Sequence, residues 1–116
     1  MDEKEIKKIV ATYFGFTPSI KIGNKKIRIT QGEDIDGDVN EVKKIRIRWE
    51  EHIGNLSGAA RVSPLDIMKI TGMEYSEENY RKAVEIMKGI AKREGVYFVE
   101  IVGEDKYLLI NPRYKR

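Results

Sequence analysis

Side chains that could carry out covalent or metal chemistry are scarce in this sequence of 116 residues. There is no cysteine, which excludes disulfide bonds, thiolate catalysis and cysteine-bound zinc. His52 is the single histidine, and no nucleophile can be assigned to it from the sequence. We therefore predict a protein that is not an enzyme, in which His52 is a packing residue.

Carboxylates recur through residues 33–41, and a hard divalent cation needs several oxygen ligands at close spacing. A calcium-binding EF-hand loop, however, has glycine at its sixth position and glutamate at its twelfth. Counted from Asp34, those positions hold Val39 and Ile45, and the count from Asp36 fails in the same way. A polar loop is the better interpretation, so we predict neither a metal nor a cofactor.

The basic side chains offer non-covalent chemistry instead, since the net charge is +3 and the sequence pI is about 9.0. Five of them fall on one predicted helix: Arg81, Lys82, Lys88, Lys92 and Arg93. Three more form a basic tail: Arg113, Lys115 and Arg116. One hypothesis is that these cations contact nucleic-acid phosphates. The alternative is a solvated face, in which Glu77, Glu78 and Glu85 pair with cations three or four residues further on.

The helix that would carry these cations, residues 76–95, is the clearest in the chain. Ser76 is a good N-cap, acidic residues follow in the first turn, and Gly95 can adopt the left-handed conformation that ends a helix. An apolar stripe recurs at helical spacing: Tyr80, Ala83, Val84, Met87, Ile90 and Ala91. Gly89 falls on the charged, solvent-facing side, where the missing side chain would let another backbone approach closely.

The N-terminal part of the chain contains its own predicted elements. Residues 2–14 have the apolar face of a helix, and residues 19–30 alternate as a β-hairpin does. The outward face of that hairpin holds Lys21, Lys26 and Arg28. Residues 31–38 form a polar loop and the expected internal boundary. We therefore predict an extension at residues 1–38 and a second domain at residues 39–116.

Two periodicities compete within residues 39–56. The helical face would contain Val39, Val42, Ile45, Trp49, Ile53 and Leu56, and Asp38 with Glu41 resembles a capping box. Residues 44–49, however, alternate as a strand would. We favour the helix, which explains the whole stretch and makes Trp49 a core residue. In the strand, Trp49 would lie beside two arginines and could stack on a single-stranded base.

The elements predicted after residue 58 follow a familiar order. They are a brief strand near Val62, a helix from Ser63 to Gly72, the 76–95 helix and a hairpin over residues 96–110. In this order of elements, residues 39–112 resemble the winged-helix superfamily, in which three helices are followed by a β-hairpin wing. The predicted fold is therefore an α+β winged helix with an N-terminal helix and hairpin extension.

The resemblance implies that residues 76–95 form the recognition helix, which usually enters the major groove of DNA while the wing touches the backbone. We therefore predict that the eight cations named above bind duplex DNA, in a small transcription regulator or a replication or chromatin accessory protein. The alternative is a winged-helix subunit that binds a protein in a transcription or replication complex. Acidic residues favour that alternative, because they occupy the groove-entering end (Glu74, Glu77 and Glu78) and the wing tip, residues 103–105.

Further expectations concern assembly and location. Small winged helices often pair, so we expect a homodimer formed through residues 2–14 or the 19–30 hairpin. No apolar run is long enough to span a membrane, and the first residues do not resemble a secretory signal. We expect a cytoplasmic protein without a membrane partner. The high charge, many isoleucines and few thermolabile residues are typical of proteins from thermophiles.

Overall fold

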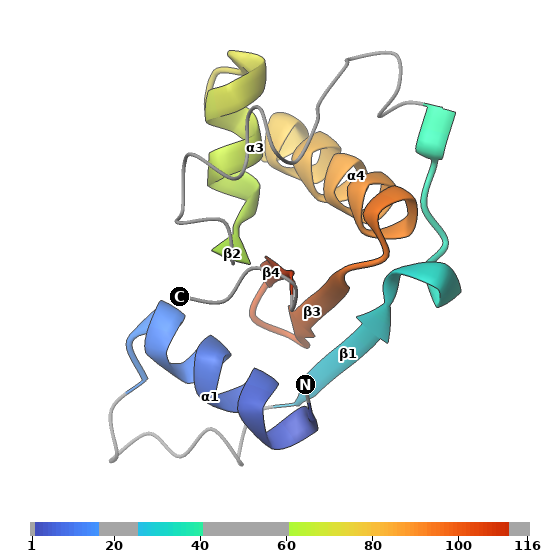
Figure 1. The fold of residues 1–116 in the computed structure, drawn as a ribbon. Coiled ribbons are helices and arrows are strands. Elements are labelled where there is room, and N and C mark those ends of the chain that lie inside the picture. The colour runs from blue at the N-terminus through green and yellow to red at the C-terminus, as the bar shows by residue number, and fades with distance from the viewer. Residues whose placement is uncertain (1, 17–25, 41–60, 112–116) are drawn as a thin grey trace.

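A computed structural model of the chain describes residues 2–16, 26–40 and 61–111. Within these ranges the fold is α+β, with three α-helices and a four-stranded antiparallel sheet (Figure 1). The helices are α1 (Glu3–Phe14), α3 (Pro64–Thr71) and α4 (Glu77–Glu94). The strands are β1 (Ile27–Gln31), β2 (Arg61–Val62), β3 (Tyr97–Ile101) and β4 (Lys106–Ile110). A short 3-10 helix, η2 (Gly32–Asp34), follows β1.

Local sequence sets the ends of the helices. The Asp2 carboxylate accepts a hydrogen bond from the backbone N–H of Glu5 (2.8 Å), and the Ser76 hydroxyl oxygen accepts one from Asn79 (3.0 Å). All three α-helices end at a glycine with a left-handed backbone: Gly15, Gly72 and Gly95. The helices predicted at residues 2–14, 63–72 and 76–95 are confirmed.

The strands are ordered β1-β3-β4-β2, and each runs antiparallel to its neighbour. The hairpin predicted over residues 96–110 is confirmed as β3 and β4, and the brief predicted strand is confirmed as β2. β1 pairs with β3, with Ile29 opposite Val99. An N-terminal strand therefore lies beside the hairpin and forms one edge of the sheet.

Alternating side chains give the sheet two apolar faces. One face packs against α3 and α4, in a core that includes Val62, Ile67, Met87, Ile90, Phe98 and Leu109. The other face is covered by α1, whose Ile6 and Val10 pack with Val99, Ile101, Leu108 and Ile110. The result is three layers, with α1 on the opposite side of the sheet from α3 and α4 (Figure 1).

The predicted loop at residues 31–38 contains η2 and packs on α4. The Asp38 carboxylate accepts a hydrogen bond from the backbone N–H of Asn40 (3.0 Å), as its predicted N-cap role requires. Most of residues 39–56, including Trp49 and His52, lies outside the described residues, as does the first strand of the predicted 19–30 hairpin. The domain boundary at residue 38 stays a prediction.

Candidate functional site

The helix α4 has two halves with different surroundings. Its predicted apolar stripe is packed toward the core, where most of its members are fully buried. The N-terminal half presents charged, exposed residues on its other side: Glu77, Glu78, Arg81, Lys82 and Glu85. In the C-terminal half, the segment that follows β1 packs against the backbone of the helix, although the side chain of Lys92 stays exposed. The N-terminal half, which we call the exposed half of α4, is the more accessible to a partner.

The covering segment is residues 32–37, which we name the strap. Its two glycines lie against the backbone of α4: a Cβ atom at Gly32 would collide with the Ala91 carbonyl, and one at Gly37 would lie 2.5 Å from the Lys88 carbonyl oxygen. Between them Ile35 is buried in the core, and its carbonyl accepts a hydrogen bond from Lys92 Nζ (3.2 Å). Glycine is needed at both ends because no side chain would fit there.

The strap corrects the prediction that Gly89 faces solvent. Gly89 is buried, and a Cβ atom on Gly37 would lie 2.8 Å from its backbone nitrogen. The backbone of the strap therefore packs close to Gly89, on the side that the sequence predicted to be open to a partner. That backbone belongs to the same chain, because β1 joins the sheet beside β3 and directs the strap across α4.

Arg81 and Lys82, the predicted contact residues on the exposed half of α4, are both held by carboxylates. Arg81 Nη1 lies 2.8 Å from Asp105 Oδ1, in the turn between β3 and β4. Lys82 Nζ lies 3.7 Å from Glu78 Oε1, which is the pairing predicted at four-residue spacing. The predicted partner of Arg81 is Glu77, whereas the structure pairs it with a residue brought close by the hairpin.

The three other predicted cations on α4 also contact groups of the chain itself. Lys88 Nζ lies 3.3 Å from Glu85 Oε1, as predicted, and Lys92 donates to the strap. Arg93 is largely buried, and its Nη2 lies 2.8 Å from Glu94 Oε1. The tail residues Arg113, Lys115 and Arg116 lie outside the described residues. Whether any of these eight residues binds nucleic acid stays a prediction.

Asp105 joins the β3–β4 turn to α4 through two groups. Its carboxylate accepts a hydrogen bond from Arg81, and its backbone carbonyl accepts one from Tyr80 Oη (2.6 Å). Burial, and then the Asp105 charge, raise the pKa of Tyr80 to about 12. The Asp105 charge also raises the pKa of Arg81. The tyrosine is therefore neutral and the arginine charged throughout the physiological pH range.

A hollow of about 240 Å³ lies beside the strap, between a cation of β1 and the helix α4. Arg28 and Lys88 both line it, so part of the predicted hairpin face does approach the predicted helix face. Asp34, Asp36 and Glu100 line the same hollow, and Glu100 Oε1 lies 3.5 Å from Arg28 Nη1. The charge of this hollow is mixed rather than basic.

A second hollow, of about 550 Å³, runs along the exposed half of α4. Among the described residues that line it, two are apolar, Met73 and Ile86. The others among them are charged: Asp38, Glu78, Arg81, Lys82 and Glu85. No family model, curated protein or solved structure matches the chain. The chemistry of this surface is therefore what points to a function.

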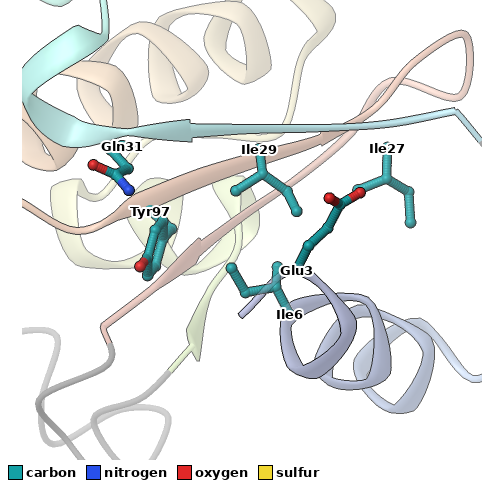
Figure 2. Close-up of a pocket in the computed structure, with 6 residues that line it drawn as sticks. All are labelled: Glu3, Ile6, Ile27, Ile29, Gln31 and Tyr97. Carbon is teal, nitrogen blue, oxygen red and sulfur yellow. The ribbon is translucent and has the colours of Figure 1, made fainter. Parts of the chain in front are cut away.

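A third hollow, of about 330 Å³, lies on the α1 side of the sheet at the β1 edge. Figure 2 shows Ile27 and Ile29 reaching from β1 toward Ile6 on α1, with Glu3 between them. Gln31 and Tyr97 complete its lining. Glu3 is the one carboxylate among the described residues that line this hollow, so they form no arrangement suited to acid–base chemistry.

Among residues 2–16, 26–40 and 61–111, no three histidine, aspartate or glutamate side chains are grouped as a metal ion would require. In the same part of the chain, no helix combines the length and apolar character needed to cross a bilayer.

Two parts of this site were not foreseen from the sequence. The acidic residues of the β3–β4 turn were predicted to weaken DNA binding, but nothing in the spacing indicated that Asp105 contacts Arg81. The strap was predicted only as a loop. Gly89 was the one indication of it. Glycine destabilises the interior of a helix, so a glycine at such a position suggests that another group packs closely against it.

Proposed function

We propose that the chain is a non-enzymatic winged-helix protein that binds a protein partner through the N-terminal half of α4. The element order β2-α3-α4-β3-β4 supports the winged-helix interpretation, as does the pairing of β2 with β4 beside the hairpin. Under this interpretation β3 and β4 form the wing. α1, β1 and the strap are additions that cover the other sheet face and half of the recognition helix.

The main support for a protein partner is that the α4 cations are already paired with groups of the same chain. Arg81, Lys82, Lys88 and Arg93 each lie within 4 Å of a carboxylate, and Lys92 donates to a backbone carbonyl. A nucleic acid gains its affinity mainly from cations that neutralise its phosphates. Exposed carboxylates also surround Arg81 and Lys82, namely Glu77, Glu78 and Glu85. A phosphate backbone would therefore meet more negative than positive charge on this surface.

The same surface has the composition of a protein interface. Such interfaces combine an apolar centre with a polar rim, and they are rich in tyrosine and methionine. The hollow along α4 has Met73 and Ile86 inside a charged border. Tyr75, which is 79% exposed, lies in the turn just before α4. A partner with an apolar centre and charges of both signs would match this surface.

Affinity capture of the tagged chain from nuclease-treated lysate of the source organism tests the proposal. We expect one stoichiometric protein partner for the wild type, and loss of that partner for Lys82→Glu. Lys8→Glu is the matched control, because Lys8 is exposed on α1, on the other side of the sheet. Recovery that requires intact nucleic acid, or that is equally weakened by both variants, would contradict a protein site on α4.

Duplex DNA is the second candidate, for a small transcription regulator or a replication or chromatin accessory protein. The net charge of +3 supports it, as does the exposure of Arg81 (56%) and Lys82 (60%). Surface ion pairs contribute little to stability, so in this second function both cations would exchange their carboxylates for phosphates. Titration with a labelled duplex at two salt concentrations tests this function. Binding that is absent at low salt, or insensitive to salt, would exclude it.

A second copy of the chain is the third candidate partner that we propose to test. Ile6 and Val10 are buried against the sheet, so the apolar face of α1 is already used within the chain. The other predicted dimer surface is the 19–30 hairpin, of which β1 stands at one end of the strand order, next to the hollow that Figure 2 shows. Light scattering that shows a monomer at high concentration would exclude a dimer.

A further inference from the structure

The β3–β4 turn places a carboxylate at the point where an anion approaching α4 would meet its first arginine. Asp105 Oδ1 lies 2.8 Å from Arg81 Nη1, and the two side chains are 44% and 56% exposed. This ion pair is therefore at the surface and open to competition from solvent ions. A phosphate oxygen could bind this part of the Arg81 guanidinium only by displacing the carboxylate.

The backbone, rather than a flexible side chain, determines where this carboxylate lies. Asp105 has a left-handed backbone with φ of 55°, and Tyr80 Oη donates a hydrogen bond to its carbonyl (2.6 Å). The ring of Tyr107, the second residue after it, packs near that of Tyr80, with centroids 6.5 Å apart. The backbone of Asp105 is therefore held beside α4 by a contact that does not involve its carboxylate.

We propose that Asp105 is a specificity-determining residue, which keeps nucleic-acid phosphates from Arg81 and so favours a protein partner for α4. The proposal rests on the proposed function only in taking the exposed half of α4 as the contact surface. Asp105 acts in two ways: it occupies the guanidinium, and its charge repels any phosphate that approaches. Removal of the carboxylate should therefore allow phosphate contact without any change in the fold.

The test is the substitution Asp105→Asn, measured by titration with a short labelled DNA duplex at several salt concentrations. Asparagine tolerates the left-handed backbone and keeps the carbonyl that Tyr80 contacts. We expect the affinity for the duplex to rise by about two- to tenfold at low salt. We also expect the plot of log affinity against log salt to become steeper by about one, because one more phosphate contact forms.

Two controls test whether the gain in affinity depends on where the removed negative charge lies, and not only on the loss of a negative charge. Glu104→Gln removes a negative charge from the same turn, but Glu104 pairs with Lys106 (3.7 Å) rather than with Arg81, so we expect little gain. Arg81→Gln combined with Asp105→Asn should cancel the gain in duplex affinity, because that gain comes from a phosphate contact made by Arg81. Asp105→Gly, which also allows a left-handed backbone, is a second variant should the asparagine variant fold poorly.

Three results would overturn the proposal. They are no gain in duplex binding for a folded Asp105 variant, an equal gain for Glu104→Gln, and a gain that persists without Arg81. The proposed function has a separate test in the Lys82→Glu capture experiment. A wild-type chain that captures no protein partner there, together with a gain for Asp105→Asn, would remove the proposed function but leave intact the inference that Asp105 keeps phosphates from Arg81.

Discussion

Gly37 lies so close to α4 that a Cβ atom on it would be 2.5 Å from the carbonyl oxygen of Lys88. The contact is between two stretches of backbone, so no side-chain rotation can relieve it. It fixes the strap against the helix and determines which part of α4 a partner can reach.

Gly37→Ala should therefore destabilise the protein. We expect a loss of about 1–3 kcal/mol in the free energy of unfolding, since the added methyl group must push the strap away from the helix. Urea unfolding followed by circular dichroism measures this loss. Glu33→Ala is the control, because Glu33 is exposed in the same strap, and its effect should stay within about 0.5 kcal/mol. Equal stability of the two variants would mean that the strap does not bind α4 tightly.

The substitution Ile6→Ala tests whether the N-terminal part unfolds with the rest of the chain. Ile6 is 2% exposed, beneath the sheet, and its truncation should cost about 2–5 kcal/mol in the free energy of unfolding. Because α1 covers one face of the common sheet, we expect a single transition shared by near- and far-ultraviolet circular dichroism. Two separate transitions, or an effect no larger than that of Lys8→Ala, would support the predicted boundary at residue 38.

Tyr80 should make stability fall at high pH. Its pKa is raised from the ordinary value of 10.0 to about 12, so above pH 10 the unfolded chain loses this proton more readily than the folded chain. The contribution is therefore complete below pH 10 and declines as the pH rises toward 12. Burial also raises the pKa of Tyr13 and Tyr107, so they add to the decline.

Comparison of the wild type with Tyr80→Phe isolates this contribution. At neutral pH the variant should lose about 1 kcal/mol, because the hydrogen bond to the Asp105 carbonyl is gone. Above pH 10 its stability should fall less steeply than that of the wild type. Urea unfolding at a series of pH values measures both effects, and identical slopes for the two proteins would show that Tyr80 ionises normally.

Elements determined by local chemistry could be predicted from the sequence. Ser76 and Gly95 mark the ends of α4 through caps that act within a few residues, and periodicity identified its buried stripe. The alternation of Ile27 and Ile29 likewise indicated a strand. Alternation shows which face of a strand is apolar, but it does not show which strand lies beside it. The pairing of β1 with β3 could therefore not be predicted.

The same limit applies to the candidate site. The short-range pairs, Lys82 with Glu78 and Lys88 with Glu85, follow from helical spacing and were predicted. The contact between Arg81 and Asp105 depends on how the hairpin packs against α4, and spacing contains no such information. Gly89 was predicted to face solvent, and only the fold shows that the strap packs against it.

We expect the strap to keep Lys88 and Lys92 from phosphates. Lys92 is exposed, but its ammonium group donates to the Ile35 carbonyl, and Lys88 pairs with Glu85. Salt-dependent titration of a labelled DNA duplex with the wild type and with a Lys88→Gln, Lys92→Gln double variant measures this. We expect either no binding by the wild type at low salt, or the same slope of log affinity against log salt for both proteins. A wild-type slope that flattens by about two in the variant would mean that both lysines contact phosphates and that the strap does not block them.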